Sequence, residues 1–70
     1  MDLKISLAAA RVNACMTQEE AAKSINVSKR TIVNWEKGKV KPTLASLKAL
    51  AELYRMPIEY IFLPSTQHLK

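Results

Sequence analysis

The 70-residue chain is about half the commonest single-domain size, so we expect one domain and no separate catalytic lobe. Its single cysteine, Cys15, and single histidine, His68, exclude an internal disulfide and a zinc-finger spacing, and no stretch is typical of a secretory signal or a membrane span. The formal charge of +5 favours a polyanionic partner, and we expect a cytoplasmic protein without cofactor, metal or evident small-molecule ligand.

The first predicted element is a helix over residues 3–13, where Leu3, Leu7, Ala10 and Val12 recur at roughly helical spacing among helix-favouring alanines. Arg11 lies one turn beyond Leu7, close to the face that should be buried, and therefore needs a carboxylate partner. Cys15 follows this helix and is interpreted as a small, buried or half-buried side chain.

A second helix is predicted to begin at Gln18, because Thr17 and Glu20 form the pattern of a capping box. Its inward positions should be Ala21, Ala22 and Ile25. The small alanines would let another helix cross closely. Asn26 tolerates a left-handed backbone and stands where this helix must end.

A third helix should run from Ser28, as N-cap, to Lys37, with Ile32 and Trp35 in the core and Gly38 as the C-terminal stop. Its outer face should hold Lys29, Arg30, Val33, Asn34 and Lys37. The cations between residues 28 and 41 are Lys29, Arg30, Lys37, Lys39 and Lys41, opposed by Glu36 alone. Nearly all the excess positive charge therefore lies in this window.

A fourth helix should begin after the N-cap Thr43 and end before Pro57. Its apolar stripe comprises Leu44, Leu47, Leu50, Ala51 and Tyr54. Residues 58–63 form a short apolar run that suits a last helical turn or a strand. We favour a fifth helix because no second strand is evident. The domain is therefore predicted to span residues 1–64, followed by a polar, frayed tail over residues 65–70.

This pattern over residues 3–63 resembles the helix-turn-helix domain of lambdoid phage repressors and Cro proteins, the xenobiotic-response-element type. The resemblance rests on Gln18, Ala21, Ala22, Ile25, Val27, Ile32 and Trp35, and on the run NWEKGKVKPTL from Asn34 to Leu44. It implies an all-α, compact five-helix, lambda-repressor-like fold, with the helix-turn-helix formed by the second and third helices.

The resemblance also implies how the surface would bind double-stranded DNA. A helix fits the major groove, where arginine or lysine addresses guanine and asparagine addresses adenine. By analogy with the family, the base-reading residues are Lys29, Arg30 and Asn34, with Ser28 able to contact base or phosphate. The phosphate-binding candidates are Gln18, Thr31, Lys37, Lys39 and Lys41.

Further expectations follow from the family. Arg11 should form a structural ion pair with Glu36. Many members carry glycine at the positions of Cys15 and Asn26; a left-handed cysteine would cost about 1 kcal/mol, which predicts a different backbone path there. A homodimer matches two half-sites, and the residues that divide between the core and the dimer interface are Tyr60, Ile61, Phe62 and Leu63.

The sequence therefore predicts a small phage-, plasmid- or prophage-type repressor that binds an inverted-repeat operator and carries no ligand-sensing module. An enzyme is not expected, because no histidine accompanies the scattered serines and carboxylates and no glycine-rich phosphate loop is present. The alternatives are a protein-interaction module of the same fold, such as an antitoxin or bridging factor, and an excised domain of a longer repressor.

Overall fold

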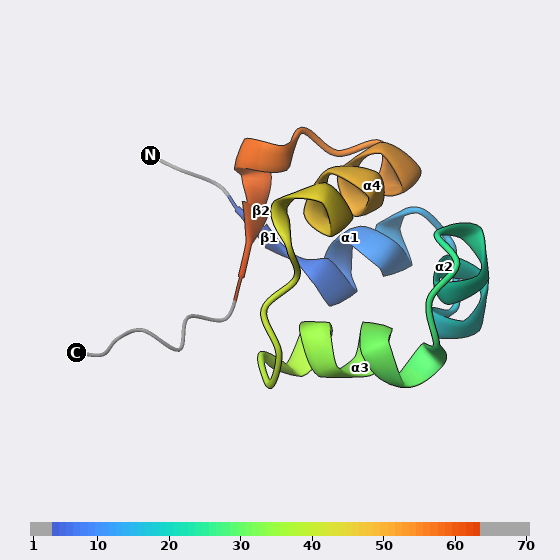
Figure 1. Cartoon of the computed structure of the whole chain (residues 1–70). Helices are drawn as coiled ribbons and strands as arrows, with labels where there is room; N and C mark the ends of the chain where they lie inside the picture. The colour runs from blue at the N-terminus through green and yellow to red at the C-terminus, as the bar shows by residue number, and fades with distance from the viewer. Residues whose placement is uncertain (1–3, 64–70) are drawn as a thin grey trace.

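The structure, a computed structural model, describes residues 4–63 (Figure 1). This range contains, in order, β1 (Ile5–Ser6), α1 (Leu7–Asn13), α2 (Gln18–Ser24), α3 (Lys29–Lys37), α4 (Leu44–Tyr54), the 3₁₀-helix η1 (Ile58–Tyr60) and β2 (Ile61–Phe62). The four predicted α-helices are present. The tail predicted over residues 65–70, with His68, lies outside the described residues.

The predicted fifth helix is wrong, because residues 58–63 form a single 3₁₀ turn and then the strand β2. β2 pairs in parallel with β1, with Ile5 opposite Ile61 and Ser6 opposite Phe62. The partner strand β1 lies within residues 3–13, which the sequence predicts as the first helix. That helix begins only at Leu7, because Ser6 has an extended backbone and its side chain accepts a hydrogen bond from the Ala9 N–H.

Four hydroxyl side chains define the starts of the four α-helices. Each accepts a hydrogen bond from the backbone N–H three residues later, and they are Ser6, Thr17, Ser28 and Thr43. The capping box of Thr17 and Glu20 and the left-handed C-cap Gly38 are confirmed. Such a cap stabilises a helix by about 1 kcal/mol, which matters for helices of only 7 to 11 residues.

Left-handed backbone occurs at three non-glycine residues of the described chain, Cys15, Asn26 and Arg55. Asn26, with a φ of 63°, ends the α2 segment as predicted. Cys15 has a φ of 60°, so the backbone does not take a different path there, and its side chain is exposed rather than half-buried. The chain therefore bears the steric cost of a left-handed cysteine, about 1 kcal/mol, between α1 and α2.

One hydrophobic core joins all four helices and β2. Its buried side chains are Leu7, Ala10, Ala21, Ala22, Ile32, Trp35, Leu50, Ala51, Tyr54 and Ile61. Ile25 and Leu47 are only half-buried against this core. Leu44, predicted on the apolar stripe of α4, is 64% exposed because it is the first residue of the helix, where the chain enters from the exposed loop after α3.

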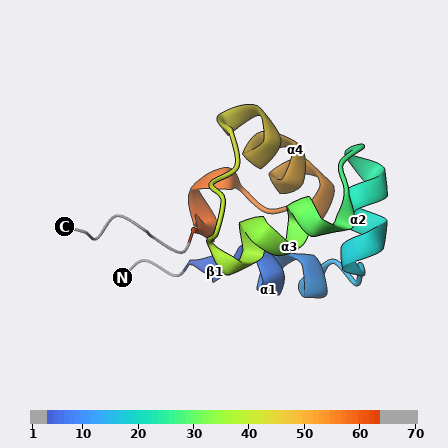
Figure 2. The same ribbon diagram turned by 60° about the horizontal axis from the view of Figure 1, so that its bottom comes forward.

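The helices enclose this core with α1 in the middle, α4 and α3 on opposite sides of it, and α2 at one end (Figure 1). When the molecule is turned so that its bottom comes forward, α3 lies at the front and no other helix or strand lies before it (Figure 2). No helix within residues 4–63 has the length and apolar character needed to cross a membrane.

Candidate nucleic-acid interface

The helices α2 and α3 form one unit joined by a tight turn. The turn is closed by the Val27 N–H, which donates to the Ala22 carbonyl at 2.9 Å, and by the Asn26 N–H, which donates to the Lys23 carbonyl at 3.3 Å. Ala21 and Ala22 are buried where the helices pack. Small side chains at buried positions allow another helix to approach closely.

The helix α3 is anchored on one side and exposed on the other. Ile32 and Trp35 are buried in the core, so Trp35 is a core residue as predicted. The opposite side presents the exposed Lys29, Arg30 and Lys37 and the half-buried Val33 and Asn34. Five predicted outer-face residues thus share the free side of α3, which Figure 2 brings to the front.

The first turn of α3 uses its hydroxyl groups internally. Ser28 Oγ accepts from the Thr31 N–H at 3.1 Å, and the two hydroxyl oxygens lie 2.9 Å apart. Ser28 therefore fixes the start of the helix, and this cap occupies part of its hydrogen-bonding capacity. Lys29 and Arg30 follow it directly and are exposed.

The lysine-rich loop after α3 is held against the end of that helix. The Asn34 carbonyl accepts from the Lys39 N–H at 2.9 Å and from the Val40 N–H at 3.4 Å. Lys37, Lys39 and Lys41 are all exposed. The structure therefore places Lys37 at the end of α3 and Lys39 and Lys41 on the loop that follows it.

A polar network under this surface ties three helices together. Arg11 Nε donates to Glu36 Oε2 at 2.7 Å and Arg11 Nη2 donates to Glu36 Oε1 at 3.3 Å. The side chains are 14% and 8% exposed. Arg11 Nη1 also donates to the Met16 carbonyl at 2.9 Å. The hydrogen bond with Glu36 raises the pKa of Arg11, which favours its charged form.

Gln18 belongs to the same network. Its Nε2 donates to Glu36 Oε1 at 3.0 Å, so α1, α2 and α3 all meet at the Glu36 carboxylate. This contact uses one N–H of the amide and leaves its second N–H and its oxygen for another partner. This contact is not predictable from the sequence pattern, because it joins residues on different helices.

A second ion pair lies on the outer surface of the two-helix unit. Lys29 Nζ lies 3.2 Å from Glu19 Oε2, and the side chains are 53% and 66% exposed. The pKa of Glu19 is lowered, first by a hydrogen bond from its own backbone N–H and then by the hydrogen bond with Lys29. This pair is not predicted from the sequence, although the sequence contains an acid in the first turn of α2 and a cation at the start of α3.

Val33 was not assigned a role from the sequence. It lines a hollow of about 260 Å³ together with Lys29 and Arg30 on the outer side of α3. An apolar side chain between two cationic ones offers a place for a methyl group beside hydrogen-bond acceptors. This is the pattern that a thymine next to a guanine presents in the major groove.

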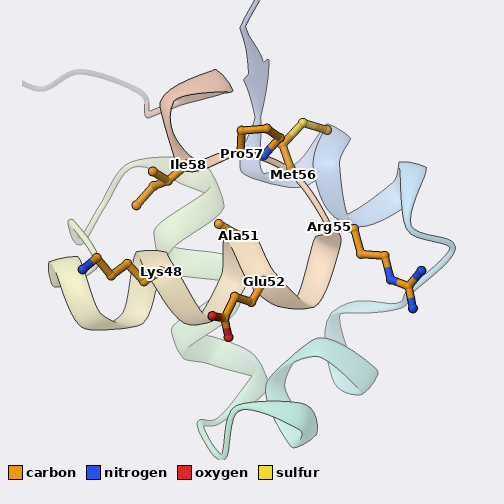
Figure 3. A pocket seen from close by; sticks show the side chains of 7 residues that line it. All are labelled: Lys48, Ala51, Glu52, Arg55, Met56, Pro57 and Ile58. Carbon is orange, nitrogen blue, oxygen red and sulfur yellow. The ribbon is translucent and has the colours of Figure 1, made fainter.

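A larger, open hollow of about 630 Å³ lies between α4 and the segment leading into η1. Its lining residues are Lys48, Ala51, Glu52, Arg55, Met56, Pro57 and Ile58 (Figure 3). The Arg55 side chain points away from Lys48 and Ile58 (Figure 3). The polar groups of this hollow therefore do not converge on one point as they do in a ligand site.

The four candidates for a dimer contact differ in burial, and only Ile61 and Phe62 lie in the strand β2. Ile61 is 6% exposed and belongs to the core, whereas Tyr60 and Phe62 are 52% and 49% exposed. Leu63 is partly buried against the core. An apolar surface at the end of the described chain is therefore formed by Tyr60 and Phe62.

Comparison with known proteins agrees with this geometry. Residues 7–61 match the family described as helix-turn-helix. Two uncharacterized HTH-type transcriptional regulators of Archaeoglobus fulgidus are 43% and 41% identical over 54 residues, which are 77% of this chain and 76% and 77% of those proteins. No solved structure matches the chain significantly.

A phage protein is also similar. The cryptic phage CTXphi transcriptional repressor RstR of Vibrio cholerae is 42% identical over 48 residues, which are 69% of this chain and 43% of that repressor. The family match covers the whole two-helix unit and the core that supports it. The chain therefore belongs to the Cro/repressor-type helix-turn-helix family of transcriptional regulators.

Proposed function

We propose that the protein is a sequence-specific, double-stranded-DNA-binding repressor that acts in the cytoplasm through a domain spanning residues 1–64. The observation that carries the proposal is the outer side of α3, which exposes Lys29 and Arg30 while Ile32 and Trp35 hold the helix in the core. The likeness to the phage repressor RstR supports repression as the direction of control.

The first turns of α3 would read bases in the major groove. Lys29 and Arg30 carry donors that suit guanine O6 and N7, and the Asn34 amide suits adenine N6 and N7. Ser28 would add a contact to a base or a phosphate with the capacity that its cap leaves free. Val33, between the two cations, would contact a thymine methyl group.

The phosphate-binding residues would lie around these base-reading residues. The second Gln18 N–H is available for a phosphate oxygen while the first stays with Glu36. The remaining candidates are Thr31, Lys37, Lys39 and Lys41. If each of the three lysines neutralises one phosphate, the log–log slope of affinity against salt should be about −3 per subunit, since the neutral Gln18 and Thr31 release no counterions.

A homodimer would present two copies of α3 to two half-sites of an inverted repeat. A symmetric dimer buries the same surface on both subunits, and the exposed Tyr60 and Phe62 supply an apolar surface for it. Half-sites one helical turn apart lie about 34 Å from centre to centre, which sets the separation that the two α3 helices must reach.

The proposal is tested by selecting bound sequences from a pool of random duplexes at two salt concentrations. We expect an inverted repeat to be enriched, and enrichment to persist at the higher salt because base contacts do not depend on counterion release. If the protein binds DNA but enriches no sequence, its binding is non-specific and the proposed sequence specificity is wrong. Absence of any DNA binding would favour the protein-interaction module instead.

A further inference from the structure

The Glu19–Lys29 pair requires an explanation other than stability. Both side chains are more than half exposed, and exposed ion pairs contribute little to folding because water screens them and the long side chains lose freedom. The pair instead joins the first turn of α2 to the first residue of α3. It therefore lies at the junction from which the proposed base-reading side chains project.

A carboxylate is an unfavourable neighbour for DNA at this position. Helix-turn-helix proteins lay the first helix of the unit across the phosphate backbone, so Glu19 would approach phosphates when Lys29 approaches base edges. Lysine is a flexible point charge that pairs with a phosphate as readily as with a guanine. Glu19 competes directly with the phosphates for the Lys29 ammonium, at a distance of 3.2 Å in the free protein.

We propose that Glu19 is a specificity-determining residue that acts through Lys29, by withholding its ammonium from non-specific phosphate contacts and directing it along the start of α3 toward a base. This inference rests on the proposed DNA-binding function. Held by Glu19, Lys29 contributes little to binding of random DNA. At the correct site, guanine O6 and N7 lie in the major groove where the Lys29 ammonium can reach both acceptors. Hydrogen bonds to these two atoms then replace the ion pair with Glu19.

The test compares the unmodified protein with Glu19→Gln on a selected site and on a scrambled duplex, over a series of salt concentrations. Glu19→Gln should bind the scrambled duplex about threefold more tightly at moderate salt, with a log–log slope steeper by about 0.9 per subunit, since one more cation neutralises a phosphate. Affinity for the selected site should change less, so the ratio of the two affinities should fall.

A double-mutant cycle with Lys29→Met separates this role from simple repulsion. In the Lys29→Met background, Glu19→Gln should leave the salt slope unchanged, because no ammonium is released. Equal effects in both backgrounds would overturn the role through Lys29. Glu52→Gln, an exposed carboxylate on α4, provides the same change of net charge outside the two-helix unit and should leave the slope on scrambled DNA unchanged.

The same measurements distinguish the two proposals. If the unmodified protein prefers the selected site but the cycle shows no coupling between Glu19 and Lys29, the role of Glu19 is wrong and the proposed function stands. If the unmodified protein binds neither duplex, the proposed function is wrong and the role of Glu19 falls with it.

Discussion

Arg11 Nε lies 2.7 Å from Glu36 Oε2, and this contact connects the first helix to the end of the helix that carries the proposed base readers. Gln18 adds α2 to the same carboxylate at 3.0 Å. Because both charged side chains are largely removed from water, each depends on the other for compensation. The angle between α2 and α3 is therefore set by a polar junction as well as by the packing of small side chains.

Loss of one partner from this junction should destabilise the fold. We expect Arg11→Met to lower the free energy of unfolding by about 2 kcal/mol or more, because it leaves the Glu36 carboxylate with a single side-chain partner. Urea denaturation followed by circular dichroism measures the change. The double variant Arg11→Met with Glu36→Leu should lose less than the sum of the single variants. Additive losses, or single variants within about 0.5 kcal/mol of the unmodified protein, would contradict the role of the pair.

A thymine methyl group should be recognised beside Val33. Replacing the contacted thymine of a selected site with deoxyuridine removes one methyl group, worth about 0.8 kcal/mol when buried, and should weaken binding about fourfold. Val33→Ala should reduce this discrimination to less than twofold. Val12→Ala, on an exposed position of α1, is the matched control and should keep the full fourfold effect. Full discrimination by Val33→Ala would assign the methyl contact to another residue.

The features predicted well from the sequence are those encoded by near neighbours. The caps Thr17 and Ser28 each bond to a residue three positions away, and Gly38 and Asn26 meet a local need for left-handed backbone. Periodicity likewise places Ile32 inside. Such signals depend only on residues within one turn of the chain, so they can be recognised in the sequence without knowledge of the fold.

The features missed depend on residues far apart in the chain. The pairing of Ile5 with Ile61 was hidden because each strand has only two residues, too few for an alternating pattern. The Glu19–Lys29 pair depends on how the turn places two helices. Leu44 fits the apolar periodicity of α4. Periodicity alone does not show whether the first turn of a helix packs against the rest of the domain, and Leu44 is exposed.

Glycine should fit the bend at Cys15 better than cysteine. At a φ of 60° the Cβ atom is crowded, so Cys15→Gly should stabilise the fold by about 0.5 to 1 kcal/mol in urea denaturation. Cys15→Ala keeps the Cβ atom and removes the thiol, and it should change stability little because the side chain is exposed. If the glycine variant is no more stable than the alanine variant, the left-handed backbone carries no such cost.

The exposed aromatic side chain of β2 should support the dimer. Because a symmetric dimer contains the substitution twice, Phe62→Ser should weaken dimerisation at least tenfold in sedimentation equilibrium, while the thermal unfolding of the monomer stays nearly unchanged. Ile61→Ser, at the adjacent buried position, should instead unfold the domain. Unchanged dimerisation of Phe62→Ser would move the interface to another surface.

The central claim is that the surface is divided into base-reading and phosphate-binding residues. It is tested most directly by measuring the affinities of Arg30→Ala and Lys39→Ala for a selected site and a scrambled duplex at several salt concentrations. Arg30→Ala should lose about 1 to 3 kcal/mol on the selected site and relax the preference at one base position. Lys39→Ala should weaken both duplexes alike and make the log–log slope shallower by about one. Equal losses from both variants on both duplexes would contradict the account.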